Sequence, residues 1–196
     1  AGKSTLLKIL TLITKPSKGQ VIVDGQDAAE QPAKIKKQIG VVSHQIFLNE
    51  KLTAKENLEF YGEMYNVPNL KNRIFEVINQ VGLEFSINDP VRTYSRGMQQ
   101  RLAIARAILH DPAILFLDEP YTGLDPHAIQ ILNKVLGQFN LNKRTVFMIT
   151  HNFDEGLELG DRIAFLVNGR IVYDCKNTLS KEDLKSLYLR KVEGAA

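Results

Sequence analysis

The sequence predicts an α/β fold in which a mainly parallel sheet carries an inserted helical lobe. Short apolar runs rich in β-branched residues alternate with helical patterns along most of the 196 residues. Such alternation is typical of a parallel sheet covered by helices on both faces. Between about residues 48 and 110 the alternation stops, and only helical patterns appear. We therefore expect one domain over residues 1–196, with residues 48–110 as a helical lobe within it.

The individual elements follow from apolar spacing and turn residues. Before the lobe we expect a helix over 3–13, a strand over 20–24 ending in an Asp24-Gly25 turn, a helix over 32–38 and a buried strand over 39–43. In the lobe we expect helices over 54–65, 70–81 and 99–110. After it we expect strands over 114–118 and 145–150, helices over 126–139 and 153–159, a hairpin of 162–167 with 170–174, and a last helix capped by Ser180.

The composition is that of a globular protein with a core. Hydrophobic residues make up 44% and charged residues 24%, and the net charge of +3 includes no long block of Lys or Arg, so we expect no nucleic-acid partner. Cys175 is the single cysteine, which favours a reducing compartment. The longest apolar runs are far shorter than the ~20 residues that span a bilayer. If the protein acts at a membrane, a partner must supply the spanning part.

Gly2-Lys3-Ser4-Thr5 opens the first predicted helix and fits the second half of a phosphate-binding loop. Gly2 would let the backbone approach the phosphates, Lys3 would neutralise their charge, and the Ser4 hydroxyl would ligate magnesium. An ordinary helix start is the alternative explanation. The first half of the motif and the strand before it are not in the sequence, so we expect the N-terminal strands of the fold to lie outside it.

Asp118 and Glu119 directly follow a run of four apolar residues. Both carboxylates are therefore predicted at the C-terminal end of a buried strand, where open α/β sheets bind their ligands. Asp118 is suited to holding a magnesium ion, and Glu119 to orienting a water molecule. The alternative is a strand that ends at the surface, with both carboxylates in solvent.

The run Ser95-Arg96-Gly97-Met98-Gln99 lies at the start of a helix in the predicted lobe. Ser95 is explained as an N-cap. Gly97 is not, because glycine in a first helical turn costs up to ~1 kcal/mol relative to alanine. The glycine indicates that another group approaches the backbone closely, and a helix N-terminus attracts phosphate.

Three further residues are placed at strand ends or helix starts. Gln45 follows a predicted strand and could ligate magnesium and report on a γ-phosphate; a solvated loop glutamine is the alternative. His151 ends another strand and could contact the γ-phosphate or the attacking water. The alternative is a histidine at a strand end whose hydrogen bonds are all made within the fold. Asp125 precedes a proline, so simple N-capping explains it in isolation.

Together these motifs occur in one order: phosphate loop, glutamine, Ser-x-Gly-x-Gln, Asp-Glu, histidine. That order resembles the ATP-binding cassette (ABC) family over essentially the whole chain. The resemblance implies a P-loop NTPase fold and a head-to-tail dimer, in which each ATP lies between the phosphate loop of one subunit and the signature sequence of the other. It implies these roles: Gly2, Lys3, Ser4 and Thr5 on phosphates and magnesium, Gln45 and Asp118 on magnesium, Glu119 as general base or water-orienting residue, His151 as switch histidine, Ser95, Gly97 and Gln99 on the γ-phosphate across the dimer, and Asp125 in the loop linking the two sites.

The signature departs from the usual Leu-Ser-Gly-Gly-Gln of that family. Ser95 and the second glycine, Gly97, are kept, but Arg96 replaces the first glycine and Met98 holds the place of the glutamine, so that Gln99 is displaced by one position. This variant is similar to those of the branch that contains heme, drug, lipid and sodium exporters. The aromatic residue that stacks on adenine in the family is expected upstream of this sequence.

The resemblance implies the ATP-hydrolysing subunit of an exporter at the cytoplasmic face of the cell membrane. Its partners would be a transmembrane permease and a second ATPase subunit, and its cofactors ATP and magnesium. The alternative is a soluble ABC-type ATPase of an assembly machine, for example in iron–sulfur cluster assembly. The compact lobe argues against the coiled-coil members of DNA repair and chromosome structure, and Glu119 with His151 argues against a nucleotide sensor without catalysis.

Overall fold

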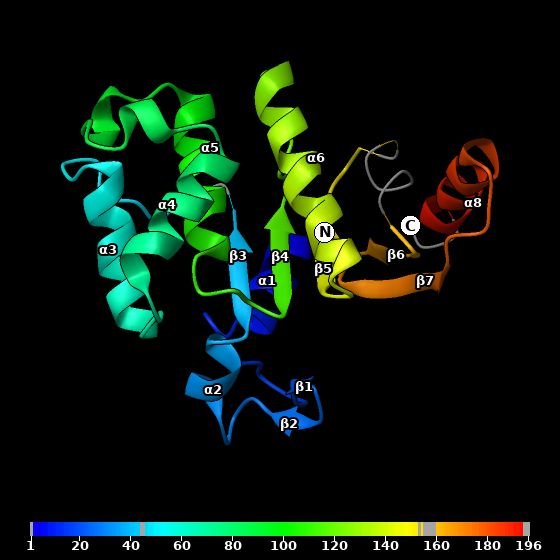
Figure 1. Cartoon of the computed structure of the whole chain (residues 1–196). Helices are drawn as coiled ribbons and strands as arrows, with labels where there is room; N and C mark the ends of the chain where they lie inside the picture. The colour runs from blue at the N-terminus through cyan, green and yellow to red at the C-terminus, as the bar shows by residue number, and fades with distance from the viewer. Residues whose placement is uncertain (1, 44–45, 153, 155–159, 194–196) are drawn as a thin grey trace.

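The computed structural model describes residues 2–43, 46–152, 154 and 160–193 and confirms the predicted fold class (Figure 1). Its central sheet is parallel, with the order β3-β4-β5, and consists of β3 (Ile39–Val42), β4 (Ile114–Asp118) and β5 (Thr145–Ile149). Two antiparallel pairs accompany it: β1 (Ile22–Val23) with β2 (Gln26–Asp27), and β6 (Arg162–Val167) with β7 (Arg170–Lys176). β1 is shorter than the strand that we expected over 20–24.

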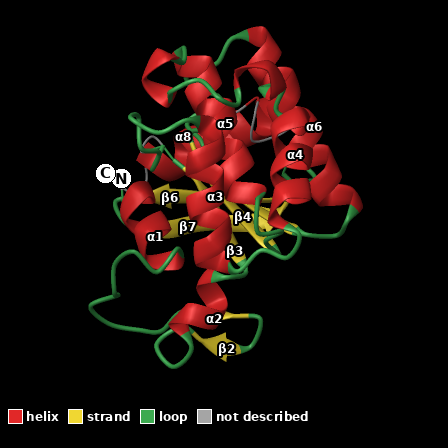
Figure 2. Ribbon diagram, turned by 60° about the vertical axis from the view of Figure 1, so that its left-hand side comes forward, coloured by secondary structure: helices red, strands yellow, loops and turns green. Residues whose placement is uncertain are grey.

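Helices cover both faces of the sheet (Figure 2). The named α-helices of the described residues are α1 (Lys3–Leu10), α2 (Pro32–Lys36), α3 (Ala54–Tyr65), α4 (Leu70–Gln80), α5 (Arg96–Ile108), α6 (Pro126–Leu141) and α8 (Lys181–Glu193). Side chains alternate along β4, as a strand with two covered faces requires. Leu115 and Leu117 are buried in the core that contains α5 and α6, whereas Phe116 is buried with Leu7 of α1 and Ile35 of α2.

The segment between β3 and β4 holds α3, α4, α5 and two short 3-10 turns, Glu84–Ser86 and Val91–Thr93, with no named strand among its described residues. The exact boundaries of the lobe stay a prediction. α5 starts at Arg96, earlier than the predicted helix over 99–110, because the Ser95 hydroxyl oxygen accepts the N–H of Met98 and fixes the first turn there. The predicted helix over 153–159 lies outside the described residues except for Asp154. No helix in the described ranges is long and apolar enough to cross a bilayer.

The two predicted Xaa-Gly turns are confirmed. Asp24 and Gly25 have φ values of +49° and +71°, and Asn168 and Gly169 have +48° and +76°. Two consecutive positive φ values are typical of the tight hairpin turn that matches strand twist. The second turn joins β6 to β7 in the predicted hairpin.

Two polar contacts tie α5 to β3. The Arg106 guanidinium donates to the carbonyl oxygen of Val41 at 2.7 Å. The Nε2 atom of His110 lies 3.0 Å from the carbonyl oxygen of Ile39. His110 also stacks on Tyr65 at 4.0 Å between ring centroids, and burial lowers its pKa to about 4. Because residue numbers rise along α5 as they fall along β3, the two elements are antiparallel. The N-terminus of α5 therefore lies toward the carboxyl ends of β3 and β4.

Gly40→Ala should destabilise the fold by about 1–3 kcal/mol, the usual cost of overpacking. The added Cβ would lie 2.4 Å from the carbonyl oxygen of Ala107, so the backbone of α5 would have to move off β3. Gly137→Ala on the exposed side of α6 is the matched control, since nothing lies within 4 Å of its Cβ; it should gain up to ~1 kcal/mol of helix propensity. Urea unfolding measures both, and a Gly40→Ala protein as stable as its control would contradict the close contact.

Candidate active site

β4 ends in two successive carboxylates. Asp118 is the last residue of the strand and is only 9% exposed, because four apolar residues bury the strand between its covering helices. Glu119 has a φ of +51°, a region that residues other than glycine rarely occupy. Its N–H donates to the carbonyl oxygen of Ile149 at 2.8 Å. Backbone outliers of this kind are concentrated at functional sites.

Glu119 is paired with His151. The Nδ1 atom of His151 lies 2.7 Å from Oε2 of Glu119, although 32 residues separate them in the sequence. The Glu119 side chain is 14% exposed and that of His151 74% exposed. An ionised carboxylate only accepts hydrogen bonds, so Nδ1 carries the proton in this pair and the Nε2 side of the ring is left for a ligand. The carboxylate is thus held in place while the imidazole faces outward.

The start of α5 is fitted against the loop that follows Glu119. Gly97 is buried in the first turn, and a Cβ added to it would lie 2.9 Å from Oδ2 of Asp125. Asp125 in turn caps α6, since its Oδ1 accepts the N–H of Ala128 at 2.8 Å. The close approach that the glycine predicted is therefore made, within one chain, by a carboxylate. We call residues 95–99 the signature turn and residues 119–125 the 119–125 loop.

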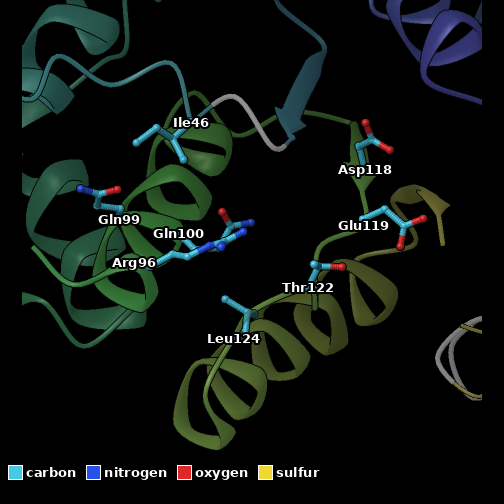
Figure 3. Close-up of a pocket in the computed structure, with 8 residues that line it drawn as sticks. All are labelled: Ile46, Arg96, Gln99, Gln100, Asp118, Glu119, Thr122 and Leu124. Atoms are coloured by element: carbon cyan, nitrogen blue, oxygen red, sulfur yellow. The ribbon is translucent and has the colours of Figure 1, made fainter. Parts of the chain in front are cut away.

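A cavity of about 460 Å³ lies between the signature turn and the end of β4 (Figure 3). In Figure 3 the side chains of Arg96 and Gln100 extend from α5 into the cavity, toward the side that carries Glu119. The lining is Ile46, Arg96, Gln99, Gln100, Asp118, Glu119, Thr122 and Leu124. It therefore combines hydrogen-bond donors from one element with carboxylates from another.

The residues around the signature turn are anchored in the lobe. Tyr94 is buried, its hydroxyl donates to the carbonyl oxygen of Ser86 at 2.6 Å, and burial raises the pKa of its phenol to about 12. The amide of Gln99 donates to the carbonyl oxygen of Val91 at 3.4 Å. Gln99 touches the cavity, but its amide is directed into the lobe.

Comparison with known proteins assigns this arrangement to a family. The sequence model described as "ABC transporter" matches residues 1–122. The chain belongs to the ABC transporter family. Because its relatives are ATP-binding subunits of ABC transporters and it superposes on a post-hydrolysis cassette, the chain is an ATP-binding, ATP-hydrolysing domain of an ABC transporter.

Individual relatives support the same assignment. The ABC transporter ATP-binding protein NatA of Bacillus subtilis is 34% identical over 200 residues, which cover 98% of this chain and 81% of NatA. The daunorubicin/doxorubicin resistance ATP-binding protein DrrA of Streptomyces peucetius is 34% identical over 192 residues, or 97% of this chain and 58% of DrrA. The dimeric post-hydrolysis structure of the ATP-binding cassette MJ0796 with ADP and Pi superposes with a TM-score of 0.80 at 29% identity, over 91% of this chain and 82% of that one. Nothing in these matches supports the iron–sulfur assembly alternative.

The ABC phosphate-loop residues lie apart from the cavity. Gly2 has a φ of +86° and precedes α1, and Lys3, Ser4 and Thr5 form its first turn, with both hydroxyl residues exposed. The N–H groups of a first helical turn have no acceptor within the helix, which suits them to phosphate. None of these four residues lines the cavity. Gln45 lies outside the described residues.

The chain carries the kinds of ligand that magnesium takes when it is bound together with nucleotide. Among the described residues no group of three or more His, Cys, Asp or Glu side chains is gathered for a metal. Magnesium with ATP needs no such cage, because it keeps waters and takes one or two carboxylates plus phosphate oxygens. The buried carboxylate of Asp118 and the hydroxyl of Ser4 are ligands of that kind.

The sequence did not single out Arg96, Gln100 and Thr122 as part of the site. A usable signal existed for two of them. Arg96 and Gln100 are four residues apart, so they lie on one face of a helix that begins at the signature turn. Thr122 lies between Glu119 and Asp125 and lines the cavity from the loop side.

Gly97→Ala should lower ATP turnover about tenfold or more while the fold is retained. The new Cβ would meet Oδ2 of Asp125 and push the signature turn away from the 119–125 loop, an overpacking cost of about 1–3 kcal/mol that falls on the site. The same substitution favours the helix itself by up to ~1 kcal/mol. Steady-state ATP hydrolysis and the melting temperature separate the two effects, and a fully active Gly97→Ala protein would show that the contact does not matter for turnover.

Proposed function

We propose that this ABC ATPase drives the export of a substrate across a membrane by closing as a head-to-tail dimer around ATP and reopening after hydrolysis. One observation carries the proposal. The signature turn and the end of β4 share a cavity, yet the phosphate-loop residues on α1 do not line it. One chain thus presents two half-sites. A second copy, turned head to tail, would bring its phosphate loop to this signature turn.

Each half-site has a distinct role in the proposed reaction. Gly2, Lys3, Ser4 and Thr5 bind the phosphates, and Ser4, Gln45 and Asp118 hold magnesium. The bound metal supplies charge neutralisation for the phosphate oxygens. Ser95 and Gly97 would face the γ-phosphate of the partner subunit's nucleotide, and Asp125 lies in the loop that links the two sites. Gln99 would join them only if its amide left the Val91 carbonyl oxygen and turned out of the lobe.

Glu119 is the proposed general base or water-orienting group. Its carboxylate is largely buried and is held by the imidazole of His151, so it presents one fixed acceptor toward an attacking water. His151 keeps its second nitrogen free for the γ-phosphate or the same water. Closure of the dimer excludes bulk water, which strengthens every electrostatic contact within the site.

The export direction, the partners and the location are inferred from the relatives and from the surface of the lobe. DrrA is named for drug resistance, and other relatives are named for linearmycin resistance and fluoroquinolone export. The segment after Gln45 and the adjacent helix expose Phe47, Phe60 and Met64, at 41%, 60% and 52%. An apolar surface of this kind suits a permease loop. The chain would then work at the cytoplasmic face of the membrane, with a permease and a second ATPase subunit.

Glu119→Gln in the full-length protein should lower ATP turnover by roughly 100-fold or more, the size of a lost general base, and leave ATP-dependent dimerisation intact. Glu50→Gln is the matched control, because it removes one exposed carboxylate outside the site. Phosphate release and size-exclusion chromatography with Mg-ATP measure the two effects. Wild-type turnover by Glu119→Gln would remove Glu119 from this role.

Co-purification tests the transport proposal. We expect the full-length protein, taken from gently solubilised membranes, to bring a multi-span membrane protein with it. Mass spectrometry of the complex identifies that partner. Only soluble partners, with the protein remaining in the cytosolic fraction, would overturn the proposal and leave an ATPase of another machine.

A further inference from the structure

Arg96 is an unexplained residue of the site. It is the first residue of α5, at the place where the usual signature of the family has a glycine. A cation near a helix N-terminus opposes the helix dipole, and the first turn of α5 contains no acidic residue to offset it. Within the described part of the chain, its guanidinium has no hydrogen bond and no ion pair. Neither helix stability nor a charge partner therefore accounts for it.

The guanidinium of Arg96 lies close to the backbone of Gly123. A Cβ added to Gly123 would lie 3.2 Å from the Cζ atom of Arg96 and 3.3 Å from Nε. Gly123 also has a φ of +75°, which a side chain would strain. The flat guanidinium thus packs on a backbone that only glycine fits.

The 119–125 loop is a compact pair of turns. The N–H of Thr122 donates to the carbonyl oxygen of Glu119 at 3.1 Å, and that of Leu124 to the carbonyl oxygen of Tyr121 at 3.2 Å. One end of the loop is the catalytic Glu119, and the other is Asp125, which caps α6. The two hydrogen-bonded turns make the loop rigid, so a displacement of Gly123 would also displace Glu119.

The signature turn touches this loop at two points, Gly97 against Asp125 and Arg96 against Gly123. We propose that Arg96 is a positioning residue that couples the two nucleotide sites: by packing on Gly123, it links the signature turn, which holds the partner subunit's ATP, to Glu119, which acts on ATP bound to its own chain. This inference rests on the proposed dimer. It gives the Arg-Gly-Met form of the signature a physical role.

The coupling predicts a specific kinetic signature. Arg96→Ala should lower kcat about tenfold and bring the Hill coefficient for ATP toward 1, with KM within about twofold of the wild-type value. Arg96→Lys should lower kcat too, because an ammonium group has no plane to pack on the Gly123 backbone. Arg92→Ala is the matched control, since it removes an exposed cation of the same lobe four residues earlier.

A double-mutant cycle tests the contact itself. Gly123→Ala should lower kcat strongly in the wild-type background and much less in Arg96→Ala, because the clash with the guanidinium is then gone. Gly19→Ala gives the effect of backbone strain alone, since Gly19 has a φ of +84° and nothing within 4 Å of its Cβ. All variants are assayed as full-length protein reconstituted with its partner subunits, and melting temperatures confirm that they fold.

Each outcome decides between the alternatives. Additive effects of the two substitutions, or an unchanged kcat in Arg96→Ala, would overturn the coupling. A KM raised tenfold with kcat unchanged would also overturn it, because Arg96 would then be a plain nucleotide contact. Glu119→Gln is assayed in parallel: if it abolishes turnover while Arg96→Ala does not change it, only the coupling fails and the proposed ATPase mechanism stands.

Discussion

The packing of α5 on β3 is the constraint on which the rest of the site depends. Gly40 lets the carbonyl of Ala107 approach the strand, and Arg106 and His110 bond to its carbonyl groups. With its C-terminal half fixed in this way, a straight helix can project its N-terminus in only one direction, past the carboxyl ends of the parallel strands. The signature turn therefore faces Asp118 and Glu119 across the cavity.

The same junction ties the lobe to β3 and to Phe47 in the segment that follows it. Arg106 is largely buried, which lowers the pKa of its guanidinium, and among the described residues no carboxylate pairs with it. The cation is held instead by a carbonyl group and by the rings of Tyr61 and Phe47, at 5.2 and 5.6 Å. The Tyr61 hydroxyl also donates to the carbonyl oxygen of Phe47. Strand end, loop and lobe thus surround one buried charge, and losing one of these partners while the charge stays buried would leave its desolvation uncompensated.

The sequence was sufficient where a local pattern decides the structure. Four apolar residues before two acids placed β4 and its carboxylates, and Asn168-Gly169 placed the hairpin. The sequence was insufficient where a contact joins residues that are distant along the chain. The positive φ of Glu119 and its bond to His151 require β5 to lie beside β4. Likewise, the sequence could not decide that Gln100 rather than Gln99 extends into the cavity. That choice depends on the helix starting at Arg96 and on the Val91 carbonyl oxygen, which accepts the Gln99 amide.

The two walls of the cavity carry opposite charges, which indicates why closure of the dimer should depend on nucleotide. Asp118 and Glu119 are adjacent in sequence and both largely buried, whereas the guanidinium across from them belongs to the other wall. Like charges in a site of low dielectric repel each other more strongly than in water. A magnesium ion with ATP supplies the positive charge on the carboxylate side and the negative charge that a helix N-terminus with an added arginine attracts. In the proposed dimer, nucleotide bound beside the carboxylates of one subunit would thus attract the signature turn of the partner subunit, and loss of the γ-phosphate would remove the group on which that attraction depends.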